Sequence, residues 1–326
     1  MTHHITRRSF SLAALSVAAG AASAQSSAYP TRSVKIIVAA AAGSSPDSIG
    51  RTLSTKLTDA WNQSVVVENV VGLGGITGTE RLARQPADGY TIAVSTIGAT
   101  AVSGALMSLP YDPEKDITPI IKIMEMPNLM VVHPKVPVKD LRELIAYVKQ
   151  NPGKLRYGHP GMGTTPHLSG ELLNQLAGVK IQGIPYKSSA QMMNDLLAGH
   201  YEILFHNSSV VLPHARSGGA RLLGITSPQR SDALPEVPTV AEAGGLPGFA
   251  VGAWFGLYAP AGTPPEIINK INTDVAAILR QPDVKTWVEK QGGATGGGTP
   301  RELRDYQLAE SKKWGDMIRT AGIKAE

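Results

Sequence analysis

An apolar strand that breaks into a loop of small residues and then turns helical constrains this chain more than any other feature. The stretch Val34–Arg51 has the sequence VKIIVAAAAGSSPDSIGR, in which Pro46 suits a first helical turn and Asp47 can cap it. Such a loop leaves backbone N–H groups unpaired and directs them, with the positive end of the helix dipole, toward one point. The hydroxyl groups of Ser44 and Ser45 add donors, so the stretch predicts a helix N-terminus that suits an anion.

The same pattern occurs again in the middle of the chain. In Tyr157–Glu171, YGHPGMGTTPHLSGE, the residues Gly163, Thr164 and Thr165 precede Pro166 and a helical pattern. A single turn of this kind is common in α/β proteins and indicates little by itself. Two copies on two lobes could face one cleft, which raises the expectation of a ligand.

The N-terminal segment has the composition of an export signal. Residues 1–24 carry Arg7 and Arg8, then an alanine-rich apolar run, then an A-x-A cleavage pattern. The arginines stand before an aromatic residue and a leucine, which favours the twin-arginine route; an ordinary secretory signal is the alternative. We therefore expect a periplasmic protein, and no later run approaches the ~20 apolar residues that a membrane span needs.

Composition excludes several classes of protein. The 326 residues include no cysteine, which excludes disulfides, thiolate catalysis, zinc–cysteine sites and an acylated N-terminal cysteine. The formal net charge is +5, and no cluster of lysine or arginine is interleaved with aromatic residues, so nucleic acid is not an expected partner. A mildly basic surface favours an anionic solute. We expect a monomer.

The order of strand and helix patterns predicts an α/β fold with two lobes, each a mostly parallel sheet flanked by helices. A single core seldom grows beyond ~250 to 300 residues, which agrees with two lobes. The extended chain that ends at Val132 is the expected crossover, and the stretch after Val251 should return. Lobe 1 should then comprise 29–127 and 252–326, and lobe 2 should comprise 128–251.

The roles of one tryptophan and of one glycine-rich segment are less certain from their patterns, and each has a stated expectation. Trp254 either lines the cleft or packs at the hinge, and we favour the hinge. Gly292–Gly298 is expected to be a flexible glycine turn.

The sequence lacks the motifs of common enzymes. It has no G-x-S-x-G elbow, H-E-x-x-H pair, P-loop or close carboxylate pair. The glycines of Gly72–Gly78 follow the second strand and not the first, and their spacing departs from the dinucleotide fingerprint. His159 and His167 lie eight apart across a loop, so they do not share a helix face as metal ligands. We expect no metal, no cofactor and no enzymatic activity.

Small polar residues follow several strands, and the carboxyl edge of an open α/β sheet is where ligands bind. Ser95 and Thr96 end one strand, Ser189 and Ala190 open a helix, and His206 with Asn207 end another strand. Lys187 could pair with a carboxylate or be an ordinary surface lysine. A lone histidine is more often structural than a ligand contact, so His206 is an uncertain member of the site.

An ordered series of motifs resembles the substrate-binding proteins of tripartite tricarboxylate transporters, the Bug-type periplasmic receptors. The resemblance covers essentially all of the mature chain. It rests on Tyr29-Pro30, the A-G-x-x-x-D loop at 42–47, Glu68-Asn69 with Gly74-Gly75, Pro86 to Tyr90, Tyr157-Gly158 with Gly163-Thr164 and His167-Leu168, Pro185-Tyr186-Lys187, Pro235 to Thr239 with Glu242 to Gly244, and Pro260 to Pro264.

The resemblance implies a type II-like Venus-flytrap fold that captures an organic carboxylate and delivers it to integral-membrane transporter subunits. The loops at 42–47 and 161–165 would grip a ligand carboxylate, partly through ordered water. The residues 189–190 and 206–207 would contact the rest of the ligand. The complete set of expected ligand-binding residues is Ala42, Gly43, Ser44, Ser45, Asp47, Ser95, Thr96, Gly163, Thr164, Thr165, His167, Ser189, Ala190, His206 and Asn207.

Two departures from the family pattern bear on the ligand. Ala39 and Ala40 stand where the family usually has Pro-Phe, and His206 stands where it usually has Asp. A lost aromatic wall widens the pocket, and an acid replaced by histidine removes a negative charge. The hypothesis is therefore a di- or tricarboxylate, aromatic or otherwise, that is bulkier or more anionic than a C4 acid.

Two other functions remain open at this point. One is an exported α/β enzyme that acts on a carboxylate, with His206 or His167 as general base. The other is a sensor that has the same fold and presents its ligand to a membrane signalling partner.

Overall fold

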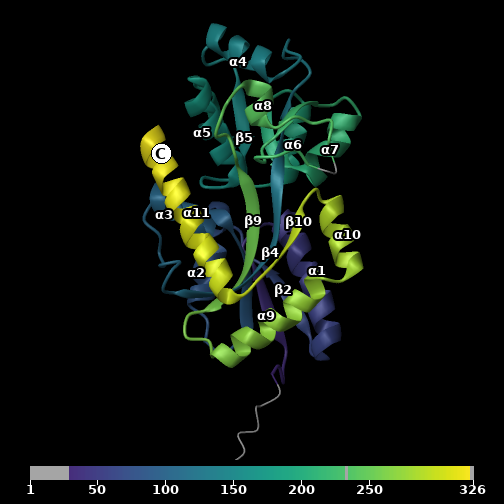
Figure 1. Ribbon diagram of the computed structural model, residues 1–326, viewed down its shortest axis with the longest axis vertical. Coiled ribbons are helices and arrows are strands. Elements are labelled where there is room, and N and C mark those ends of the chain that lie inside the picture. Colours follow the sequence, from purple (N-terminus) through teal and green to yellow (C-terminus); the bar gives the residue numbers. More distant parts are fainter. Residues whose placement is uncertain (1–28, 232–233, 324–326) are drawn as a thin grey trace, which may run out of the picture.

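The computed structural model describes residues 29–231 and 234–323, and the predicted export signal lies outside them. Its strands join into one curled 10-stranded sheet in the order β2-β1-β3-β9-β4-β7-β5-β6, with β8 and β10 paired to β4. Helices cover both halves of this sheet (Figure 1). The predicted two-lobed α/β fold is confirmed.

One half of the fold carries the first of the two loops predicted to bind an anion. Its strands are β1 (Val34–Val38), β2 (Val65–Asn69), β3 (Thr91–Thr96), β9 (Gly252–Pro260), β10 (Ala294–Gly297) and the first part of β4 (Ile117–Val132). Its helical segments are α1 (Ser45–Trp61), η1 (Leu73–Gly75), α2 (Ile76–Ala83), the π-helical η2 (Gly98–Val102), α3 (Ser103–Leu106), α9 (Pro265–Leu279), α10 (Pro282–Lys290) and α11 (Pro300–Ala321).

The other half carries the second loop. Its strands are the last part of β4, β5 (Arg156–His159), β6 (Gln182–Pro185), β7 (Ile203–Asn207) and β8 (Arg221–Ile225). Its helices are α4 (Leu141–Gln150), α5 (Thr165–Ala177), α6 (Ser189–Leu197), α7 (Ser208–Arg216) and α8 (Val240–Gly244). In Figure 1 these helices occupy the upper part of the molecule, and α1, α2, α9 and α10 occupy the lower part.

The part of the sheet in each half is mixed, which differs from the mostly parallel sheet expected in each lobe. β1 pairs in parallel with β2 and β3, and β5 pairs in parallel with β6 and β7. β9 is antiparallel to β3 and β4, and β4 is antiparallel to β7, β8 and β10. The reason is topological: β4 carries the chain from one half to the other and β9 carries it back, so the two strands must run in opposite directions.

The partners of β4 change at the crossover. As far as Pro127 the strand pairs with β9, and from Asn128 onward it pairs with β7. The lobe ranges 29–127 with 252–326 and 128–251 stay a prediction, and this change of partner supports them.

Thr226 joins the two crossing segments between the halves. It is fully buried, its hydroxyl group donates to Val251 O (2.6 Å), and it accepts from Asn128 N–H (2.8 Å). The backbone N–H of Thr226 donates to Asn128 O, and its carbonyl accepts from Val251 N–H. One side chain therefore satisfies backbone groups of both connections at the hinge.

The prediction for Trp254 is confirmed as far as packing goes, and the prediction for Gly292–Gly298 is wrong. Trp254 is 1% exposed and packs edge-to-face against Tyr306 with ring centroids 5.4 Å apart, so it is a packing residue. The stretch expected to be a flexible turn instead contains β10, which pairs with β4. A Cβ atom at Gly293 would lie 2.6 Å from Glu125 O, and one at Gly296 would collide with Lys122 O. Glycine is needed here because the two backbones approach so closely.

Side-chain caps set several helix starts. Asp140 accepts from Glu143 N–H (2.9 Å) and caps α4, which begins at Leu141. Thr299 and Glu302 form a capping box at the start of α11. Within the described residues, no helix combines the length and the apolar character needed to cross a bilayer.

We predict that Thr226→Val destabilises the fold by about 1 to 3 kcal/mol, because it leaves buried N–H and C=O groups without their partner. Urea unfolding of the purified protein measures the change. Thr320→Val is the matched control, since Thr320 is exposed on α11 and its hydroxyl bonds only to Asp316 O. Equal stability of the two variants would contradict the role assigned to Thr226.

Candidate functional site

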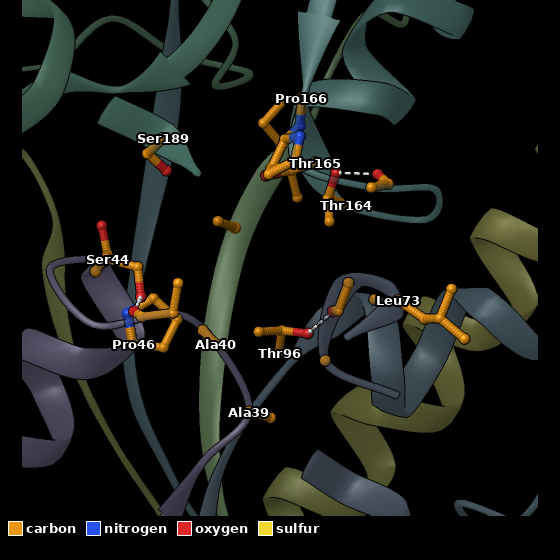
Figure 2. Close-up of a pocket in the computed structure, with 18 of the residues that line it drawn as sticks. Ala39, Ala40, Ser44, Pro46, Leu73, Thr96, Thr164, Thr165, Pro166 and Ser189 are labelled. Atoms are coloured by element: carbon orange, nitrogen blue, oxygen red, sulfur yellow. Dashed lines mark hydrogen bonds between the residues drawn. The ribbon is translucent and has the colours of Figure 1, made fainter. Parts of the chain in front are cut away.

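A cavity of about 730 Å³ lies between the two halves of the fold. The first turns of α1 and α5, the end of α6 nearest β6, and the junction of β7 with α7 border it. Figure 2 shows Ser44 and Pro46 on the left, Thr164, Thr165 and Pro166 at the top, and Ala39, Ala40 and Thr96 below this upper group. Its volume falls in the range of pockets that enclose small molecules.

The loops that lead into α1 and α5 have similar backbone conformations at the last glycine and at the N-cap residue. Gly43 and Gly163 have φ of 77° and 73°, a left-handed conformation that glycine adopts without strain. The N-cap hydroxyl of Ser44 donates to Ala41 O, and that of Thr164 donates to Gly161 O, both at 2.6 Å. Neither hydroxyl caps its helix, so the first-turn N–H groups stay available.

The third residue of each of these two helices accepts a hydrogen bond from the glycine of the loop before it. Asp47 Oδ2 accepts from Gly43 N–H (2.8 Å), and His167 Nδ1 accepts from Gly163 N–H (3.4 Å). Burial raises the pKa of the Asp47 carboxyl, but hydrogen bonds from Arg51, Gly43 and Asn69 outweigh burial and hold this pKa below its usual value. Burial lowers the pKa of His167 to about 4, so its ring is neutral at pH 7. The two side chains support the loops.

The first turns of α1 and α5, which border the cavity, therefore have unpaired backbone donors. An α-helix cannot satisfy its first N–H groups internally, and Pro46 and Pro166 remove one each. The N–H groups of the first and third helical residues remain in each helix. They carry the positive end of the helix dipole, which makes both ends suitable for an anion.

A second group of polar residues connects the two halves. Asn207 Nδ2 donates to Ser45 Oγ across the cavity at 2.6 Å. His206 Nδ1 accepts from Asn207 N–H (2.8 Å), and its Nε2 lies 3.1 Å from Ser189 Oγ. Burial lowers the pKa of His206 to about 4. The hydrogen bonds assign the proton to Nε2, and the neutral ring orients Ser189 and Asn207.

Eight of the fifteen predicted ligand-binding residues lie on the cavity wall. They are Ser44, Ser45, Thr96, Thr164, Thr165, Ser189, His206 and Asn207. The other seven do not line it: Ala42, Gly43, Asp47, Ser95, Gly163, His167 and Ala190. Several of these support the wall from behind, as Asp47 and His167 do, and Ser95 is buried against Thr79 with their hydroxyl oxygens 3.0 Å apart.

The loop Gly72–Gly75 also lines the cavity, although none of its residues is among the fifteen predicted from the sequence. Thr96 Oγ1 donates to Gly74 O (3.0 Å) and holds the loop in place. Leu73 has φ of 46°, which is uncommon for a leucine, and is 65% exposed. The glycine-rich spacing is the only signal in the sequence that could have indicated it.

The charge on the cavity wall is small. Of the described residues that line it, Lys187 alone has a side chain charged at neutral pH, and it is exposed before α6. No group of three or more histidine, aspartate or glutamate residues among those described could hold a metal ion. The site is built from backbone N–H groups, hydroxyls and apolar side chains.

Comparison with protein families gives one match that covers most of the chain. Residues 49–323 match the model of the tripartite tricarboxylate transporter family receptor. Protein BugT of Bordetella pertussis is similar, at 37% identity over 93% of this chain and 94% of that protein.

Solved structures agree with this match. An R. palustris protein with adipate has a TM-score of 0.86 and 37% identity, over 91% of this chain and 99% of that one. MatC from Rhodopseudomonas palustris, with bound malate, has a TM-score of 0.83 and 33% identity, over 89% of this chain and 100% of that one.

We predict that the free energy of unfolding decreases as pH falls from about 6.5 toward 4. Burial lowers the pKa of His159, His167 and His206 to about 4, and at His159 the neighbouring His167 is a second cause. Between pH 6.5 and 4 the unfolded chain therefore binds more protons than the folded chain, which favours unfolding. Denaturant unfolding at a series of pH values measures the slope. His206→Gln should flatten it, while His200→Gln, at an exposed position, serves as the substitution control. Stability that does not change between pH 6.5 and 5 would contradict this account.

Proposed function

Because the chain belongs to the tripartite tricarboxylate transporter family of receptors, we propose that it captures an organic carboxylate in the periplasm and delivers it to membrane transporter subunits. The observation that carries the proposal is the pair of uncapped helix N-termini, α1 and α5, at one cavity. A carboxylate between them accepts hydrogen bonds from N–H and O–H groups and needs no buried cation.

The geometry of the two loops suits a carboxylate in particular. A carboxylate has two oxygens that accept several hydrogen bonds each. The α1 loop offers Ser45 and the N–H of Asp47, and the α5 loop offers Thr165 and the N–H of His167. One group can then contact both loops, directly or through a water molecule. The neighbours with adipate and malate hold ligands of this class.

Closure of the two halves would link capture to delivery. Asn207 and Ser45 come from opposite halves and meet at 2.6 Å beside the cavity. A ligand held between α1 and α5 favours the arrangement in which these residues meet, because it bonds to both halves at once. A membrane partner could recognise that arrangement.

A receptor family is not an enzyme family, so the alternative of an exported enzyme is wrong. The site agrees with this conclusion. His206 uses one ring nitrogen toward Asn207 and the other toward Ser189, and His167 is committed to its own loop. The sensor alternative differs only in the membrane partner.

We predict that carboxylates raise the melting temperature of the mature protein. A ligand at a hundredfold excess over its Kd stabilises the folded state by about 2.7 kcal/mol. Ser45→Ala and Thr165→Val should each weaken binding about tenfold, because each removes a hydroxyl next to a charged group. Thermal-shift assays followed by calorimetric titration measure these effects.

The matched control is Thr52→Val, which lies on α1 with its hydroxyl bonded to Ser48 O. It should leave affinity within about twofold of the original. Failure of mono-, di- and tricarboxylates alike to shift the melting temperature would contradict the proposed function.

A further inference from the structure

The cavity away from the two helix N-termini is apolar. Its floor, defined here as Ala39, Ala40, Ala253 and Phe255, offers methyl groups and a ring. Its rim, defined here as Val71, Leu73, Met107 and Met162, consists entirely of large apolar residues. Such surfaces stabilise a ligand by removing apolar area from water, and they offer no side-chain hydrogen bonds beyond the weak thioether acceptors.

The rim is built in a way that packing alone does not explain. Val71 and Leu73 are 57% and 65% exposed, which makes them two of the few large apolar side chains on the described surface. Leu73 also has a left-handed backbone, which is unfavourable for a leucine. Strained residues at a cavity indicate a functional constraint more often than a structural one. In Figure 2, Leu73 and Ser189 lie on opposite sides of the cavity.

Several polar side chains of the wall bond to neighbouring groups of the wall. Thr96 donates to Gly74 O, His206 bonds to Ser189, and Asn207 donates to Ser45. Ser188 caps α6 by accepting from Gln191 N–H. After one carboxylate has bonded to α1 and α5, the hydroxyl hydrogen of Ser189 and the second N–H of Asn207 remain as donors, and neither carries a charge to pair with a second carboxylate.

A second carboxylate would also lack a buried counter-charge. Lys187 is the one charged side chain among the described lining residues, and it is exposed at the edge. The His206 ring is neutral because it is buried and because its Nδ1 accepts from Asn207 N–H and so carries no proton. Burying an unpaired carboxylate is costly, so the cavity disfavours ligands with two or three of them.

Resting on the proposed function, we propose that the ligand is a monocarboxylate with a bulky apolar body, such as an aryl-alkanoate. The carboxylate lies between the first turns of α1 and α5, and the body lies on the floor and under the rim. This proposal keeps the greater bulk that the sequence indicated and departs from the di- or tricarboxylate predicted there.

Calorimetric titration with two matched pairs of acids tests this. Hexanoate and adipate have the same chain length and differ in the second carboxylate; propionate and 3-phenylpropionate differ in the ring. We expect hexanoate to bind at least tenfold more tightly than adipate, and 3-phenylpropionate at least tenfold more tightly than propionate. Adipate or citrate binding more tightly than hexanoate, or members of either pair within threefold of each other, would overturn the proposal while the proposed function stands. If no carboxylate binds, the proposed function itself fails.

Leu73→Asn tests the rim directly. Asparagine tolerates the left-handed backbone, and the exposed position should not affect folding. We expect binding of 3-phenylpropionate to weaken at least fivefold and binding of small acids to stay within twofold. Leu308→Asn, on α11 and 39% exposed, is the control for a lost surface leucine.

Lys187→Met tests the alternative position of a second carboxylate. Hexanoate and 3-phenylpropionate should bind within twofold of the original affinity. A tenfold loss of adipate binding from a tight starting value would show a second carboxylate at Lys187 and overturn the proposal.

Discussion

The rest of the site depends on the backbone N–H groups that α1 and α5 leave unpaired at their first turns. Two positive helix ends that face one cavity repel each other unless an anion or water lies between them. The chain keeps both ends uncapped by turning the hydroxyls of Ser44 and Thr164 back onto their own loops. It compensates one end with the charge of Asp47 and leaves the other beside the neutral His167. In the proposed function, an anionic ligand supplies the negative charge that the protein itself does not place at the α5 end.

The sequence predicted this pair of loops because their information is local. A left-handed glycine, two hydroxyl residues and a proline determine the turn within a few residues, and both copies have this order. The sequence could not show which residues of the two loops line the cavity. Asp47 and His167 point back to Gly43 and Gly163, which only the folded loop reveals.

The features that sequence missed are those set by distant contacts. β10 needs glycine because it lies against β4, more than 150 residues away in the sequence, and local rules treat the same glycines as a flexible turn. The antiparallel pairing of β9 follows from the return of the chain across the hinge, where Thr226 joins both connections. Leu73 takes a left-handed conformation that leucine does not favour, so no propensity predicts it. Of these elements, Leu73 and the β9 residues Ala253 and Phe255 line the apolar part of the cavity, to which we assign the choice of ligand.

A crystal structure of the mature protein with a bound carboxylate tests the central claim most directly. The account predicts carboxylate oxygens within hydrogen-bond distance, directly or through one water molecule, of the first-turn N–H groups of both α1 and α5. It also predicts that Asn207 and Ser45 stay in contact across the cavity. A carboxylate bound instead at Lys187, with both helix N-termini occupied only by solvent, would contradict it.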